Sequence, residues 1–181
     1  FLKEKDNFGI TIHISDETDC LLDTGGGIKK AASFFTDGAP FLVHNVDILS
    51  NIDIPTLLQA YNPEEMGVVV VSKRNTQRYL LFDQEQRLCG WTNIATGEVR
   101  PTPSQFMING EMSPTIQQLA FSGMQILNPR IFDCMDKIVE QKGEKFSLID
   151  LYISIAEKEI LRAYIPENYR MMDVGKIQQL S

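Results

Sequence analysis

The sequence predicts an α/β domain in which a mixed, mostly parallel sheet is flanked by helices and carries a small antiparallel β insertion. Three observations lead to this fold class. Continuous apolar runs typical of strands buried on both faces recur along the chain, and segments with helical character alternate with them. The middle of the chain instead breaks into short strand-like pieces separated by polar turns. No internal repeat or Pro- and Ser-rich linker interrupts the pattern, so we expect residues 1–181 to form one domain.

The first part of the chain is expected to alternate between strands and helices. Residues 10–14 alternate in polarity and are β-branched, which favours a strand, whereas residues 24–35 have helical character. Residues 40–46 form a continuous apolar run that suits a strand buried on both faces. Asp53 fits the N-cap of a following helix, and residues 67–73 give another buried strand. Strand, helix and strand in this order imply a parallel unit.

The chain changes character after this second buried strand. Residues 74–108 contain short apolar pieces separated by polar turns such as 83–86, which predicts antiparallel hairpins. The remaining predicted elements are a strand at 119–127, helices at 128–141 and 146–159, strands at 160–165 and 169–174, and a final helix that begins at Gly175.

The charge pattern argues against a nucleic-acid partner and favours a bound metal ion. The net charge is −7, and the basic residues are scattered, whereas proteins that bind nucleic acid gather Lys and Arg on one face. We therefore expect no nucleic-acid partner. An anionic ligand would have to be held by backbone N–H groups, a helix N-terminus or a bound cation, which favours a divalent metal.

Cysteine usage and hydropathy indicate the compartment. Cys20, Cys89 and Cys134 are odd in number, far apart and outside any Cys-x-x-Cys pair, so we expect small buried side chains in a reducing environment. No apolar run approaches the roughly 20 residues of a membrane helix, and no signal-peptide pattern is present. The sequence thus predicts a cytoplasmic protein without membrane contact, and it leaves the oligomeric state open.

Three consecutive glycines follow Thr24, at the predicted start of a helix. The first N–H groups of a helix are unpaired and its N-terminal end is electropositive, so a ligand can approach the backbone of Gly25, Gly26 and Gly27 closely. Gly25 and Gly26 would leave room for a flat base or the face of a sugar. The alternative interpretation is a turn in which Thr24 caps the helix.

Two aspartates follow predicted strands. Asp47 comes directly after the apolar run at 40–46, and Asp173 ends the late strand that leads into Gly175. Ligands of open parallel sheets bind beyond the carboxyl ends of the strands, so both carboxylates can face one crevice. Two carboxylates, waters and phosphate oxygens are a usual set of Mg²⁺ ligands. The alternatives are a capping role for Asp47 and a simple turn at Asp173.

Four stretches carry a resemblance to a known family. The segments "LLDTGGGIKKA", "FLVHNVDIL", "FSGMQIL" and "MMDVGK" follow one another in the order and approximate spacing of sugar-1-phosphate nucleotidyltransferases. The resemblance covers nearly the whole chain. It is strongest to the compact bacterial kind, similar to N-acetylmuramate-1-phosphate uridylyltransferases and mannose-1-phosphate guanylyltransferases, and it implies a Rossmann-like domain that joins a nucleoside triphosphate to a sugar 1-phosphate.

The resemblance also implies roles for individual residues. Asp47 and Asp173 match the two aspartates that hold Mg²⁺ between the nucleotide and the sugar phosphate. The stretch from Thr24 to Gly27 matches the residues that line the nucleotide. Ser122 and Gly123 match the family's sugar-facing strand.

Asp83 is a further candidate for contact with sugar hydroxyls, although an acid in a hairpin turn is the alternative. Four positions depart from the family pattern, because Val46, Met171, Lys176 and Ile177 stand where a small residue, Trp, Thr and Pro are frequent. The basic residue that binds the sugar phosphate is not evident, since the Glu-Lys-Pro segment of larger relatives has no counterpart.

The family's Gly-x-Gly-x-Arg loop would lie before Phe1, so we expect this chain to lack the nucleotide-binding segment and to be weakly active alone. The base and the sugar cannot be read from these residues. Two other functions remain open at this point: a metal-dependent glycosyltransferase and a non-catalytic module that binds nucleotide sugars.

Overall fold

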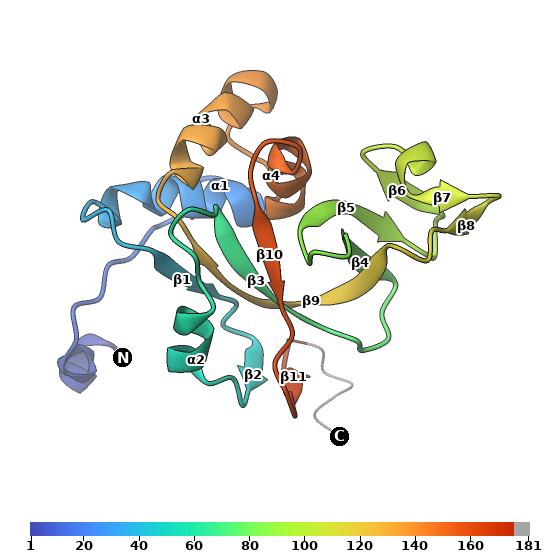
Figure 1. Ribbon diagram of the computed structural model, residues 1–181. Helices are drawn as coiled ribbons and strands as arrows, with labels where there is room; N and C mark the ends of the chain where they lie inside the picture. The colour runs from blue at the N-terminus through green and yellow to red at the C-terminus, as the bar shows by residue number, and fades with distance from the viewer. Residues whose placement is uncertain (176–181) are drawn as a thin grey trace.

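The computed structural model describes residues 1–175 and shows a central sheet with helices on both faces (Figure 1). The seven-stranded sheet has the order β10-β3-β9-β4-β5-β6. Strand β4 pairs with the start of β9, and β1 pairs with its end. Its strands are β1 (Phe41–His44), β3 (Gly67–Ser72), β4 (Arg78–Phe82), β5 (Leu88–Asn93), β6 (Glu98–Arg100), β9 (Gln117–Leu127) and β10 (Leu161–Tyr164).

Two small sheets and the helices complete the described part. The small sheets pair β2 (Ile48–Ser50) with β11 (Met171–Asp173) and β7 (Met107–Ile108) with β8 (Glu111–Met112). The α-helices are α1 (Asp23–Lys30), α2 (Ile54–Gln59), α3 (Ile131–Lys142) and α4 (Leu148–Ile155). Short 3-10 helices cover Lys3–Gly9, Ala31–Phe34 and Pro103–Gln105. Among the helices of residues 1–175, none combines the length and the apolarity that a bilayer crossing requires.

The α/β class is confirmed, but the expected predominance of parallel pairing is wrong. The long strand β9 runs antiparallel to β1, β3 and β4, and β3 with β10 is the parallel pair within residues 1–175. Apolar runs report that a strand is buried on both faces, and they carry no information on its direction. Because β1 and β3 both oppose β9, the strands β1, β3 and β10 all run in one direction and end at the same edge.

The antiparallel insertion is confirmed as hairpins. Strands β4, β5 and β6 pair in sequence order, and β4 joins the main sheet through β9, with Leu80 opposite Leu119. The insertion therefore extends the central sheet and does not form a separate layer (Figure 1).

Three local predictions are wrong. Residues 10–14 form no strand, and Ile10 and Ile14 are 65% and 73% exposed, since an alternating pattern gives a strand only where a neighbour pairs with it. The strand β1 is not buried on both faces: Leu42 is 40% exposed, because β1 pairs only with β9 among the described strands. Cys20 is exposed, whereas Cys89 and Cys134 are half-buried.

The other helix and strand predictions are confirmed within a few residues. Asp53 caps α2, because its carboxylate accepts a hydrogen bond from the Thr56 amide at 3.1 Å. Ser147 caps α4 in the same way by accepting from the Asp150 amide at 3.1 Å. The helix predicted to begin at Gly175 falls on residues 176–181, outside the described part.

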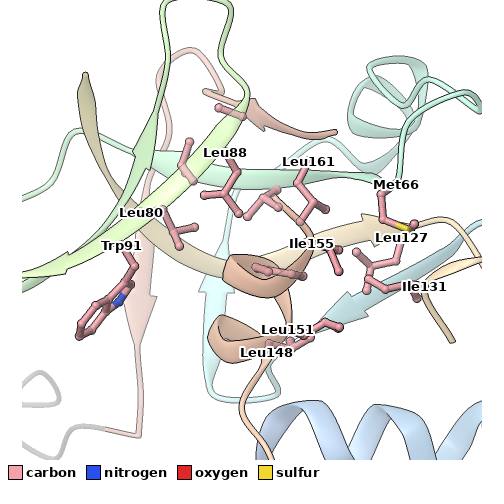
Figure 2. Packing of buried hydrophobic residues seen from close by; sticks show 14 of the residues in the cluster. Met66, Leu80, Leu88, Trp91, Leu127, Ile131, Leu148, Leu151, Ile155 and Leu161 are labelled. Carbon is pink, nitrogen blue, oxygen red and sulfur yellow. The ribbon is translucent and has the colours of Figure 1, made fainter. Parts of the chain in front are cut away.

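Buried apolar side chains form clusters on both faces of the sheet. Along β3, Val69 and Val71 belong to one cluster and Val68 and Val70 to the other, as the alternation of a strand requires. The larger cluster packs α3 and α4 onto the sheet, and Figure 2 shows Leu151 among its side chains. The second cluster packs α2 onto the opposite face. The helices thus hold the sheet in position from both faces, and the ends of its strands carry the candidate site.

Candidate active site

Strand pairing brings the two predicted aspartates together. After β1 the chain turns, with the Asn45 amide donating to the Gly123 carbonyl at 2.8 Å, and it then enters β2. Strand β11 pairs antiparallel with β2 so that Asp173 lies opposite Ile48, next to Asp47. The Val174 amide donates to the Asp47 carbonyl at 2.8 Å and fixes this register. Two residues far apart in the sequence therefore meet at the edge where β1 ends.

The two carboxylates converge on one point above Gly175. A Cβ atom placed on Gly175 would lie 2.7 Å from Asp47 Oδ2 and 3.3 Å from Asp173 Oδ1. A side chain at residue 175 would thus occupy the space between the two carboxylates, and glycine keeps this space open. Both aspartates are half-buried, so water and a ligand can still reach them.

This donor set fits Mg²⁺ better than the metals that proteins enclose completely. Within residues 1–175 no group of three or more His, Cys, Asp or Glu side chains could hold a metal ion. Two carboxylates supply hard oxygen ligands and leave the other positions of an octahedral ion to water and phosphate oxygens, which is the usual protein environment of Mg²⁺. The pair is therefore suited to a metal that is shared with a phosphorylated substrate.

Gly123 lies beside this pair, at a bulge in β9. Val69 of β3 faces Gln125 whereas Val71 faces Phe121, so the bulge places extra residues of β9 opposite Val70. Gly123 has a φ of 73°, which favours glycine, and a Cβ atom there would lie 2.9 Å from the Ile48 side chain. Gly123 thus allows the loop that carries Asp47 to pack against β9.

The expected role of the sugar-facing strand is only partly matched by this geometry. The face of Gly123 that was expected to receive a sugar is filled by the side chains of Asn45 and Ile48. Ser122 is fully buried, and its hydroxyl has no hydrogen-bond partner among the described residues. Gly123 is brought to the candidate site, whereas Ser122 does not face an open surface in this structure.

The glycines of the Thr24–Gly27 stretch pack against the loop before α4. The amides of Gly25 and Gly26 both donate to the Phe146 carbonyl, at 3.0 and 3.1 Å. A Cβ atom on Gly25 would lie 2.5 Å from the Phe146 ring, so a larger residue would push the helix away from this loop. Both glycines are buried. Close approach of two backbone segments is therefore a sufficient reason for glycine at these two positions.

Thr24 and Gly27 also make contacts within the protein. The Thr24 hydroxyl accepts a hydrogen bond from the Leu148 amide at 3.0 Å and so caps the first turn of α4 rather than its own helix. The nearest neighbour of a Cβ atom on Gly27 would be the Glu17 carboxylate. Binding of a nucleotide by residues 24–27 stays a prediction, because these contacts account for the residues without a ligand.

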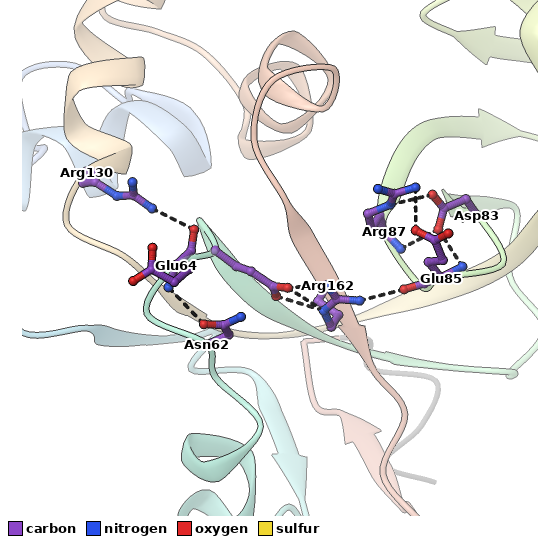
Figure 3. Close-up of polar contacts among 8 residues, drawn as sticks. Asn62, Glu64, Asp83, Glu85, Arg87, Arg130 and Arg162 are labelled. Carbon is purple, nitrogen blue, oxygen red and sulfur yellow. Dashed lines mark hydrogen bonds and ion pairs between the residues drawn. The ribbon is translucent and has the colours of Figure 1, made fainter.

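Asp83 is not brought to the carboxylate pair. It accepts hydrogen bonds from the amides of Glu85 and Arg87 at 2.9 Å and pairs with the Arg87 guanidinium, which is the geometry of a hairpin turn (Figure 3). Partial burial opposes ionisation, but the hydrogen bonds from Arg87 outweigh it and hold the pKa of Asp83 below its ordinary value. The hairpin packs beside Arg162, near the start of β10, whereas the carboxylate pair lies where the parallel strands end. These contacts support the turn interpretation, and a contact of Asp83 with sugar hydroxyls stays a prediction.

Sequence reasoning missed three basic residues at the site edge. Lys73 and Arg74 follow β3 directly, and Arg170 precedes β11. The signal was present, since Lys73 follows a buried strand just as Asp47 does, and residues at the carboxyl ends of strands face the ligand crevice.

The described residues have the fold of several solved nucleotidyltransferases. The inositol-1-phosphate CTP transferase of T. maritima superposes with a TM-score of 0.67 at 14% identity, covering 99% of this chain and 66% of that one. The UDP-glucose pyrophosphorylase of Acinetobacter baumannii has a TM-score of 0.65 at 16% identity, covering 98% and 64%.

Curated relatives confirm the resemblance that the sequence motifs indicated. The N-acetylmuramate alpha-1-phosphate uridylyltransferase of Caulobacter vibrioides is 29% identical over 171 residues, which is 92% of this chain and 62% of the relative. The UTP–glucose-1-phosphate uridylyltransferase 1 of Staphylococcus saprophyticus is 26% identical over 148 residues, 78% of this chain and 48% of the relative. The chain thus spans less than two thirds of the length of either curated relative. No family model matches the sequence.

Proposed function

We propose that this chain takes part in the transfer of a nucleotidyl group to a sugar 1-phosphate. In this reaction a phosphate oxygen of the sugar 1-phosphate attacks the α-phosphorus of a nucleoside triphosphate, and pyrophosphate leaves. The observation that carries the proposal is the convergence of Asp47 and Asp173 on one point above Gly175. The names of both curated relatives make uridine triphosphate the nucleotide to test first.

Asp47 and Asp173 would hold the Mg²⁺ of this reaction. The ion supplies neutralisation of the phosphate charges when it is bound. The protein contributes position: the β2–β11 pairing and the hydrogen bond from the Val174 amide to the Asp47 carbonyl hold both carboxylates at one edge. No protein nucleophile is required, because the sugar phosphate itself attacks, and most of the acceleration of phosphoryl transfer comes from positioning and charge stabilisation.

We expect the 181 residues by themselves to turn over slowly. They contain no Gly-x-Gly-x-Arg sequence, and donors of that kind cradle the triphosphate and stabilise its developing charge. Activity is therefore best compared between this chain and any longer protein that contains it.

The test of the proposed function is pyrophosphate release from UTP and a panel of sugar 1-phosphates in the presence of Mg²⁺. We expect Asp47→Asn and Asp173→Asn each to abolish release while the thermal unfolding of the protein stays unchanged. Asp19→Asn is the matched control, because Asp19 is exposed and makes no hydrogen bond or ion pair with any residue of the described part. Full activity of Asp173→Asn would contradict the proposal.

A further inference from the structure

A cavity of about 490 Å³ lies where β3 and β10 end. Three cationic residues line it: Lys73 and Arg74 directly follow β3, and Arg170 directly precedes β11. Its apolar wall is formed by Ile165, Pro166 and Met171. The volume lies within the range of pockets for small organic ligands, about 300–1,000 Å³.

The charge of this cavity is opposite to that of the chain. The sequence has 24 acidic and 17 basic residues, yet three cations and no carboxylate line the cavity. Within residues 1–175 no carboxylate forms an ion pair with Lys73, Arg74 or Arg170, although other basic residues of the chain do form ion pairs. Three cations around one hollow, without a carboxylate partner among the described residues, are suited to an anionic ligand.

The backbone around the cavity is fixed by hydrogen bonds. Arg74 Nη2 donates to the Phe121 carbonyl at 2.8 Å, which ties the end of β3 to the bulge of β9. The Arg170 amide donates to Asn51 Oδ1 at 2.7 Å, and the Asn51 amide donates back to the Arg170 carbonyl at 3.2 Å. Among the contacts of residues 1–175, neither the Lys73 ammonium nor the Arg170 guanidinium has a hydrogen-bond or ion-pair partner, so both are candidates to bind a ligand.

Two hydroxyl groups in the cavity wall also lack partners. Ser72 and Tyr169 line the cavity, and the oxygens of their hydroxyls are buried without a hydrogen-bond partner among the described residues. Buried polar groups normally find a partner, so this pair indicates that a polar ligand or water belongs here. Both hydroxyls can donate to an oxyanion.

The cavity is lined in part by the strand that carries Asp173. Met171 lines the cavity, and Asp173 lies two residues further along the same strand. Side chains two positions apart point to the same face of a strand, and they are separated by about 7 Å. A phosphate group in the cavity would therefore lie next to an ion held by Asp47 and Asp173.

We propose that this cavity binds the sugar 1-phosphate, with Lys73 and Arg170 holding its phosphate group and the apolar wall contacting the sugar ring. The inference rests on the proposed function, and it names the basic residues that the sequence motifs left unidentified. Asp47 and Asp173 are not among the residues that line the cavity, so binding to the cavity can be measured apart from turnover.

The experiment measures binding of α-D-glucose 1-phosphate and N-acetylmuramic acid 1-phosphate to the 181-residue chain by calorimetry, in a buffer with EDTA and no nucleotide. We expect Lys73→Gln and Arg170→Gln each to weaken binding about tenfold, the typical effect of losing one hydrogen bond to a charged group. Lys158→Gln is the control, since Lys158 is exposed and forms no ion pair within the described residues. Its affinity should stay within twofold of the parent chain.

Two results of this experiment would overturn the inference: unchanged affinity in both cavity variants, or no binding of either sugar phosphate by the parent chain at millimolar concentration. A separate titration with UTP adds a third: weaker UTP binding in the variants while their sugar-phosphate affinity stays at that of the parent chain. The last result would assign the cavity to the phosphates of the nucleotide. Failure of the proposed function can be distinguished from failure of the cavity assignment. If the parent chain releases no pyrophosphate but both variants lose affinity for sugar phosphate, the cavity assignment stands.

Discussion

The contacts of the glycine stretch predict that two adjacent glycines respond differently to alanine. A Cβ atom on Gly26 would lie 2.8 Å from the Cβ of Leu22 and closer still to the Glu144 carbonyl oxygen, which belongs to the backbone and cannot move aside alone. A Cβ atom on Gly27 would meet the Glu17 carboxylate, which accepts a hydrogen bond from the Leu22 amide at 3.0 Å but lies at the end of a side chain that can shift without moving the backbone. The two positions share one helix, so they form a matched pair.

The magnitudes follow from these contacts. Alanine gains about 0.5–1 kcal/mol over glycine inside a helix. Overpacking at Gly26 costs about 1–3 kcal/mol, and displacement of the helix also weakens the hydrogen bond from the Gly26 amide to the Phe146 carbonyl, worth about 0.5–1.5 kcal/mol. We therefore expect Gly26→Ala to lower the free energy of unfolding by about 1–3 kcal/mol and Gly27→Ala to leave it nearly unchanged.

Urea unfolding of both variants without any ligand measures this difference. Equal stability of Gly26→Ala and Gly27→Ala would refute the packing explanation, because nucleotide binding predicts no stability difference between the two in the absence of nucleotide. A larger loss for Gly27→Ala would refute it as well.

Three further predictions concern stability and reactivity. The pKa of Asp83 is below its ordinary value, so its stabilising effect is present above the unfolded-state pKa and is lost as the pH falls through the folded-state pKa. Asp83→Asn should therefore destabilise the protein more at pH 7 than at pH 3, as urea unfolding at both pH values would show. Leu151 is fully buried, so Leu151→Ala should lower the free energy of unfolding by about 2–5 kcal/mol. Leu21 is 75% exposed, so Leu21→Ala should change the midpoint of urea unfolding little. Burial, with a smaller effect of Asp83, raises the pKa of Cys89 to about 11, so a thiol reagent at pH 8 should modify the exposed Cys20 long before Cys89; equal rates would contradict this burial.

The sequence predicted the existence of most elements because their signals are local. The cap at Asp53 and the continuous apolar run of β3 depend on residues that are neighbours in the chain. The strand predicted at residues 10–14 had the same kind of local signal, but pairing depends on a neighbouring strand, and none is present among the described residues. The direction of pairing around β9 is likewise a property of the whole sheet.

The candidate site could be predicted where chemistry coincides with a strand end. Asp47 and Asp173 were found in this way, together with the order of the motifs, and the structure brings them together. Lys73 also follows a buried strand, but lysine is mostly a surface residue, so its position in the sequence does not by itself distinguish a ligand-binding side chain from a solvated one. The contacts of Gly25 with Phe146 could not be predicted, since they join segments that are far apart in the sequence.

The shared role of Asp47 and Asp173 is tested most directly by a double-mutant cycle on Mn²⁺ affinity, with Mn²⁺ as a paramagnetic probe for the Mg²⁺ site. One ion held by both carboxylates predicts that Asp47→Asn and Asp173→Asn each remove most of the affinity and that the double variant loses little more, because the two effects are coupled. Asp19→Asn should bind Mn²⁺ as the parent chain does. Additive effects of the two substitutions, or unchanged affinity in either one, would contradict a common site.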